Sequence, residues 1–272
     1  MEKLSVNYRD NTFGPDIADE CVLRAVIGAD GLALSVRRKY GKTQLLQTWA
    51  YAADQSENAL RRILNKTEMP AWPFESIELL YFTPTATIAP KRMFDPTLAG
   101  DYLHTLKENL NGKAEYEALP NMDMTAIWSN DTRLTTIGDY FFPKAKPLAY
   151  TVGLLEAFQK FSDKNDVAVC VHFRPSHIQL AAFERGSLLF FNTFLYEKPS
   201  DVLYFTLLVY DQFHLKPTDA PLFISGELLP DAEIYRQYER FIKNIRFLGA
   251  SPLMGVPDSL APHLYLDQTL FL

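Results

Sequence analysis

CVLRAVIGADGLALSVRRKYGKTQLLQTWAY, residues 21–51, is the stretch that decides the fold. Asp30-Gly31 is a two-residue turn signal, and the apolar runs on either side of it predict the two strands of a β-hairpin. A third strand is expected after Gly41. Residues 56–66, SENALRRILNK, then place their apolar side chains on one face of a predicted helix, and ESIELLYF at 75–82 predicts a fourth strand. The predicted order is β-β-β-α-β.

The same order recurs in the second half of the chain. DVAVCVHF, IQLAAFERG and SLLFFNTF predict three strands between residues 166 and 194. A helix over 200–214 and the strand PLFISG follow. Such a duplication predicts a two-lobed α/β protein with a cleft between the lobes. Pro143 and Pro147 mark the boundary, so we expect one lobe at 1–148 and a second, with a C-terminal tail, at 149–272.

Smaller elements surround these two units. An added edge strand is possible within the first 20 residues. Asp95-Pro96 predicts the capped start of a helix that runs to about Asn109, and two short strands are expected near Tyr116 and Thr125. The proline-bearing tail, which ends in LYLDQTLFL, is expected to return to the core.

The composition restricts the class of protein. The chain has 272 residues, is 47% hydrophobic and carries a net charge of −6. No basic stripe is present, so nucleic acid is not an expected partner, and no apolar run is long enough to span a bilayer. Cys21 and Cys170 are isolated, which is typical of a reducing compartment. We therefore expect a cytoplasmic protein without membrane insertion.

Two turns and one strand end provide candidate binding residues. Asp30 and Gly31 can place a carboxylate near a metal and let backbone N–H groups approach a phosphate, although Asp-Gly also closes an ordinary hairpin. In the matching turn, HFRPSH at 172–177, Arg174 and Ser176 can contact an anion, but solvated turn residues are the simpler interpretation. His172 and His177 would supply half a metal site at most. Gly226, at a strand-to-helix turn, can accommodate an adenosine or serve only the turn.

The helix over 201–214 is apolar nearly all round. We therefore expect it at the centre of the second lobe, between a sheet and a helix, with Asp201 or Ser200 as its cap. Leu208 is expected to be buried, so that its truncation to alanine would cost roughly 2–5 kcal/mol. The stripe assigned to the core is Val202, Phe205, Leu208 and Val209.

The stretch SLLFFNTFLYEKPSDVLYFTLLVYDQFHLKPTDAPLFISGELLPDAEIYRQYERFIKNI, residues 187–245, together with ADGLALSV and the proline-bearing tail, resembles the bacterial family called domain of unknown function 3822. That family resembles a divergent actin-like ATPase, close to pilus and secretion scaffolds of the same ribonuclease H-like fold. The resemblance implies ATP between the lobes, bound by an acid-and-glycine turn in each lobe and by a Gly-Gly turn. This chain departs from the pattern at all three places. The first turn keeps only Asp30-Gly31, the second reads HFRPS, and the third keeps only Gly226.

These departures separate two functional hypotheses. The first is a non-catalytic interaction or scaffold protein with an unidentified protein partner, no cofactor and no catalytic or metal-binding residues. The second is a protein that still binds ATP and Mg²⁺ with weak or no hydrolysis, through Asp30, Gly31 and Gly226. A nucleic-acid binder is the third alternative, and it would show a steep salt dependence of affinity.

Overall fold

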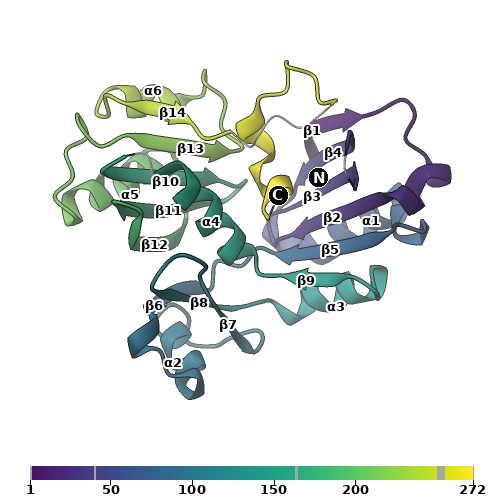
Figure 1. Cartoon of the computed structure of the whole chain (residues 1–272), viewed down its shortest axis with the longest axis horizontal. Coiled ribbons are helices and arrows are strands. Elements are labelled where there is room, and N and C mark those ends of the chain that lie inside the picture. The colour runs from purple at the N-terminus through teal and green to yellow at the C-terminus, as the bar shows by residue number, and fades with distance from the viewer. Residues whose placement is uncertain (1, 40, 163–164, 250–254, 272) are drawn as a thin grey trace.

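The first lobe is built on a six-stranded mixed sheet in the order β1-β4-β3-β2-β5-β9 (Figure 1). The computed structural model describes residues 2–39, 41–162, 165–249 and 255–271. β2, β3 and β4 form the expected antiparallel meander, and β5 and β9 extend it in parallel on the other side of β2. β1 adds the edge strand and pairs antiparallel with β4. The strands are β1 (Lys3–Arg9), β2 (Cys21–Ile27), β3 (Gly31–Arg38), β4 (Thr43–Ala50), β5 (Ser76–Tyr81) and β9 (Lys146–Leu148).

The second lobe repeats this plan without the added edge strand. Its five-stranded sheet has the order β12-β11-β10-β13-β14, in which β10, β11 and β12 are an antiparallel meander and β13 and β14 are parallel to β10. The predicted β-β-β-α-β duplication is therefore confirmed. The strands are β10 (Val167–Phe173), β11 (His177–Glu184), β12 (Ser187–Leu195), β13 (Leu222–Gly226) and β14 (Ile245–Phe247).

Helices cover the outer face of each sheet. α1 (Ser56–Thr67) and α3 (Thr132–Phe141) pack on the first sheet, and Leu60 and Leu64 enter its core. α5 (Pro199–Gln212) and α6 (Glu233–Glu239) contribute Val202 and Tyr238 to the corresponding core of the second sheet. α4 (Tyr150–Ser162) has a continuous buried face, and it packs in a third core that draws on both sheets.

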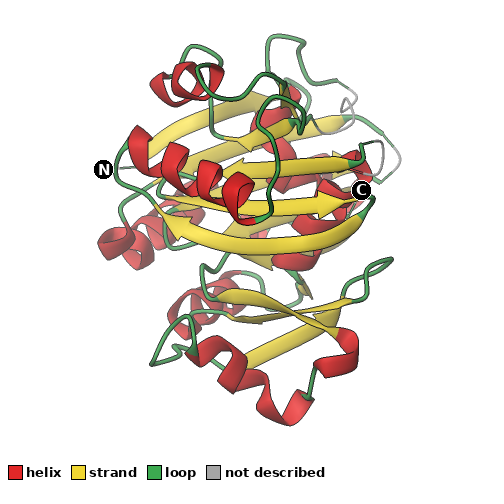
Figure 2. Cartoon of the chain, turned by 90° about the vertical axis from the view of Figure 1, so that its left-hand side faces the viewer, coloured by secondary structure: helices red, strands yellow, loops and turns green. Residues whose placement is uncertain are grey.

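A small three-stranded sheet lies apart from both large sheets (Figure 2). It has the order β6-β8-β7 and is entirely antiparallel. The predicted cap at Asp95 is present, since its carboxylate accepts the backbone N–H of Thr97 at 2.9 Å. The helix it opens is shorter than predicted, because α2 ends at His104. The elements are β6 (Ala86–Pro90), α2 (Ala99–His104), β7 (Ala114–Ala118) and β8 (Met124–Ser129).

The C-terminal segment Pro262–Thr269 returns to lie between the two large sheets, as Figure 1 shows in yellow. Leu266 and Leu270 join the core shared with α4, while Tyr265 packs against β1 and β4. The expected return of the tail is thus confirmed for its described part; residues 250–254 and 272 lie outside it. None of the described helices is long and apolar enough to cross a membrane.

The predicted buried stripe of α5 is confirmed at Val202 and Val209, which are 0% and 1% exposed, and is wrong at Leu208. Leu208 is 41% exposed, whereas Val202 and Thr206 are fully buried. The Thr206 hydroxyl turns inward, to Tyr238 Oη at 2.7 Å. Leu208 lies two positions later, about 200° around the helix from Thr206, and so faces outward. The sequence misled because a helix that is apolar nearly all round carries no clear stripe.

The start of α5 also differs in detail from the expectation. The helix begins at Pro199, with Lys198 as the flanking residue, so neither Asp201 nor Ser200 is the cap itself. Asp201 nevertheless satisfies the helix start, because its carboxylate accepts the backbone N–H groups of Glu197 and Lys198 at 3.0 and 2.9 Å. An acidic side chain in the first turn thus bonds the backbone N–H groups just before the helix, at the positive end of the helix dipole.

Candidate functional site

The two equivalent hairpin turns meet across the space between the lobes. Asp30, in the β2–β3 turn, is 1% exposed. Its Oδ1 accepts Arg174 Nε at 3.2 Å and Arg174 Nη2 at 3.0 Å, and its Oδ2 accepts Ser176 Oγ at 3.2 Å. Both Arg174 and Ser176 come from the β10–β11 turn, so a buried ion pair connects the turns of the two lobes.

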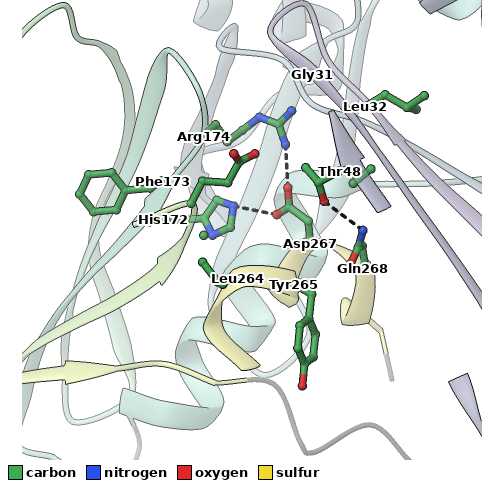
Figure 3. Close-up of a pocket in the computed structure, with 13 residues that line it drawn as sticks. Gly31, Leu32, Thr48, His172, Phe173, Arg174, Leu264, Tyr265, Asp267 and Gln268 are labelled. Carbon is green, nitrogen blue, oxygen red and sulfur yellow. Dashed lines mark hydrogen bonds and ion pairs between the residues drawn. The ribbon is translucent and has the colours of Figure 1, made fainter. Parts of the chain in front are cut away.

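A second carboxylate reaches the same guanidinium from the C-terminal segment. Asp267 Oδ2 lies 2.6 Å from Arg174 Nη1, and His172 Nε2 lies 2.8 Å from Asp267 Oδ1 (Figure 3). The Tyr150 hydroxyl donates to the same Oδ1 at 2.8 Å. The His172 ring is held from its other side by Ser225 Oγ at 2.9 Å. We call Asp30, Arg174, Asp267, His172 and Tyr150 the interlobe cluster.

Aromatic packing and a glycine fix the position of the guanidinium. Arg174 lies over the Phe82 ring at 4.2 Å from its centroid, a distance at which the ring attracts a cation. A side-chain Cβ at Gly28 would stand 2.8 Å from Arg174 Nη2. The chain therefore needs glycine at position 28 to admit the arginine.

Charge compensation decides the ionisation of both acids. Burial alone would raise the pKa of Asp30, but the charge of Arg174 and the hydrogen bond from His177 hold that pKa well below its usual range. Burial opposes ionisation of Asp267 too, yet His172 and Arg174 bring its pKa down to about 2. At neutral pH the cluster therefore holds two buried carboxylates around one guanidinium.

Little free space remains beside these groups. The cavity at this place has a volume of about 20 Å³, which is room for about one water molecule. Gly31, Gly226, Glu227 and Arg174 are among its lining residues, together with Asp267 and other residues of the C-terminal segment. Within the described part of the chain, the protein's own side chains thus occupy most of the space beside the interlobe cluster.

The C-terminal segment is tied to the first lobe by backbone recognition. Gln268 Nε2 lies 3.2 Å from Leu34 O and 3.1 Å from Gln47 O. Arg24, which is 3% exposed and paired with Glu78 at 2.6 Å, donates to the carbonyl oxygens of Gln268 and Leu270. These bonds place Asp267 at the cleft through a segment that is itself firmly anchored.

The structure brings all five sequence candidates into one neighbourhood. Asp30, Arg174 and Ser176 are directly hydrogen-bonded, and Gly31 and Gly226 line the cavity beside Arg174. Whether any of them contacts a ligand stays a prediction. The interpretation of 172–177 as a solvated turn was wrong, because Arg174 and His172 are 5% and 2% exposed. Local sequence showed no acid near them, and the acids come from Asp30 and Asp267 instead.

Backbone geometry accounts for the turn residues in detail. Gly28 N–H donates to Gly31 O at 2.9 Å, so the central residues of the first turn are Ala29 and Asp30, one position earlier than the Asp-Gly signal suggests. Gly226 has φ +84°, and a Cβ there would stand 2.0 Å from Phe173 O. Glycine is required at 226 whether or not a ligand is bound.

Sequence reasoning did not find Asp267 or Tyr150. The one available signal was an acid inside the apolar tail LYLDQTLFL, since a buried acid needs a cationic partner. In the described part of the chain, no group of three or more His, Cys, Asp or Glu side chains is arranged to hold a metal ion.

Two equivalent mixed sheets, joined by a shared core and by the interlobe cluster, define the class: the chain has the actin-like ATPase fold. It resembles a Bacteroides thetaiotaomicron protein with an actin-like ATPase fold and unknown function, with 18% identity over 95% of this chain and 97% of that one and a TM-score of 0.79. It also resembles a chain of the PilM–PilN type IV pilus biogenesis complex, with 8% identity over 92% and 97% and a TM-score of 0.59.

The particular family follows from the sequence. The chain belongs to the family described as protein of unknown function (DUF3822), whose model matches residues 10–245. Comparison with the sequences of curated proteins gives no match. The fold is thus defined by structural likeness, and the family assignment rests on most of the chain.

Proposed function

We propose that this chain is a non-catalytic interaction protein, a scaffold on a degenerate actin-like ATPase fold. The observation that carries the proposal is the position of Arg174 between Asp30 and Asp267. A site that binds nucleotide with glycine turns and an acid leaves room for phosphate and a metal ion. Here the Arg174 guanidinium supplies the positive charge that a metal ion would bring, and the Asp267 carboxylate supplies the negative charge that a phosphate would bring. The lobes are therefore joined by side chains of the protein itself.

The alternative is a nucleotide-binding protein with weak or no hydrolysis, in which ATP and Mg²⁺ displace the C-terminal segment. Asp30 would then be the carboxylate on the metal side, and Gly31 and Gly226 would allow close backbone approach. The observation in its favour is that both glycines line the cavity beside Arg174. The remaining volume, about 20 Å³, favours the scaffold instead.

Three further expectations accompany the scaffold proposal. One similar fold occurs in a complex of PilM with PilN, which supports a protein partner for this chain as well. Cys21 and Cys170 are buried free thiols, which suits a reducing cytoplasm. We place the boundary of the lobes after Leu148, where β9 ends and α4 follows at Tyr150.

Calorimetric titration of the full chain with ATP and Mg²⁺ tests the proposal. We expect no saturable binding up to about 1 mM nucleotide. A dissociation constant of that size would correspond to a binding free energy of only about 4 kcal/mol. Binding in the micromolar range that Asp30→Ala abolishes would replace the scaffold by the nucleotide-binding alternative. Circular dichroism of Asp30→Ala shows whether the variant is folded, and Asp30→Asn, which keeps the side-chain shape, provides a second comparison.

A further inference from the structure

The first sheet is wider than the layer of helices that covers it, α1 and α3. Relative to the second sheet it carries one extra strand, β1, at the edge beyond β4. α1 packs over the central strands, where Leu60 meets the β2 and β3 side chains of the same core. An open groove of about 620 Å³ therefore remains between α1 and the β1–β4 edge. This volume falls in the range of ordinary ligand-binding sites.

Apolar side chains line part of this β1–α1 groove. Trp49 from β4 is half-buried, and Ile63 from α1 and Met69 after it are buried. Leu4 from β1 lines the same groove and is 41% exposed. A leucine beside a half-exposed tryptophan is apolar surface that a bound partner would remove from water.

The polar side chains of the groove carry an excess of positive charge. Arg9, Arg62 and Lys66 line it, and Glu2 is the one acid among its described lining residues. Arg62 pairs with Glu2 at 2.5 Å but stays 62% exposed. In the described part of the chain, neither Arg9 nor Lys66 forms a salt bridge. The groove is therefore locally basic in a chain whose net charge is −6.

We propose that the β1–α1 groove docks an acidic segment of a partner protein, with leucine-like residues between its acids. Charge complementarity selects the acids, and Leu4 and Trp49 receive the apolar side chains. The groove runs beside an edge strand, an arrangement that suits an extended segment with alternating side chains. This inference deepens the proposed function and rests on it, but none of its residues belongs to the interlobe cluster.

Labelled peptides of about eight residues test the groove by fluorescence anisotropy on the full chain. The first probe alternates aspartate with leucine, the second lysine with leucine, and the third aspartate with serine. We expect saturable binding of the first probe only, weakened by added salt because the charges are exposed. Equal binding of the lysine probe, or no binding of the aspartate–leucine probe, would overturn the proposal.

Charge reversal locates the bound peptide. Lys66→Glu is expected to weaken binding by about tenfold or more, whereas Lys216→Glu, an equal change of net charge at an exposed position in the second lobe, should stay within about twofold. Leu4→Ser should weaken binding through the apolar side of the groove. Equal effects of Lys66→Glu and Lys216→Glu would refute the site. ATP binding between the lobes would not change these peptide affinities. A failure of the scaffold proposal can therefore be distinguished from a failure of the groove proposal.

Discussion

The two lobes share a topology but differ in what their first hairpin turn contributes. The β2–β3 turn supplies a carboxylate, Asp30, and the β10–β11 turn supplies a guanidinium, Arg174, at 3.0 Å. Equivalent turns that both presented glycines and acids would repel one another and attract a cation or a phosphate–metal pair. Turns of opposite charge neutralise each other. The difference shows how one fold can keep the position of a ligand site while its charges serve to join the lobes.

The lobes also differ in how far their sheets are covered. The second sheet has five strands, while β1 widens the first to six. Among the described residues, the C-terminal segment leaves a cavity of only about 20 Å³ beside the interlobe cluster, whereas the β1–α1 groove is open and measures about 620 Å³. Removing one partner of a buried ion pair strands the other charge in the interior, whereas the exposed cations of the groove can exchange their present contacts for those of a partner at little cost.

The largest expected effect comes from removing the positive charge between the turns. Arg174→Met should lower the free energy of unfolding by about 3–5 kcal/mol, because Asp30 and Asp267 would remain buried without the guanidinium between them and, of their ion-pair contacts, would keep only those to His177 and His172. Urea denaturation measures it. Arg133→Met is the matched control, since Arg133 also faces two acids, Asp131 and Glu57, but is 62% exposed. Its cost should be about 0–1 kcal/mol. Similar costs for both variants would contradict the burial argument.

Acid should then loosen the contact between the lobes. The pKa of an aspartate is about 3.9 in the unfolded chain, and His172 and Arg174 lower that of buried Asp267 to about 2, so its stabilising contribution is complete above about pH 5 and is lost as the pH falls toward 1. Asp267 alone should account for roughly 2–3 kcal/mol over that interval. Asp267→Asn should flatten the pH dependence of the unfolding free energy, and Asp211→Asn, at an exposed position of α5, should not.

If the unfolding free energy of Asp267→Asn depended on pH as steeply as that of the parent chain, the carboxylate of the C-terminal segment would not contribute to the ionic contact between the lobes. Since Arg174 also faces Asp30, the variant keeps one carboxylate on the guanidinium and should remain folded at neutral pH. Its melting curve at pH 7 therefore separates loss of charge from loss of fold.

The fold was predictable from the sequence because short local patterns indicate its strands, turns and helices. The turn at Asp30 and the helical spacing of Leu60 and Leu64 each act within a few residues. The strands of the two meanders and the helices that follow them rest on such patterns, whereas the added edge strand and the returning tail were expected without a local signal of this kind. The helix after Asp95 was overextended because a cap fixes where a helix starts and says little about where it ends.

The interlobe cluster was predictable only in part because its partners are far apart in sequence. Asp30 and Arg174 are separated by 144 positions, and Arg174 and Asp267 by 93. Nothing near Arg174 reveals an acid, so a solvated turn was the simpler interpretation. Once the second hairpin is placed opposite the first, the same residues become a buried pair. Pairing of this kind is set by topology, which the local pattern does not encode.

The smallest expected effect is that of Leu208→Ala in α5, and its counterpart for comparison is Leu60→Ala in α1, the helix that follows the third strand of the other meander. Leu60 in α1 is fully buried, and Leu208 in α5 is 41% exposed. Leu60→Ala should therefore cost roughly 2–5 kcal/mol, from lost burial and the cavity left behind. Leu208→Ala should cost less than about 1 kcal/mol, as substitutions on a surface do. Thermal melts of the two variants, recorded beside the parent chain, measure the difference. A Leu208→Ala variant as unstable as Leu60→Ala would mean that the outer face of α5 is covered in solution, for example by a second molecule, and sedimentation of the parent chain at rising concentration would then show that association.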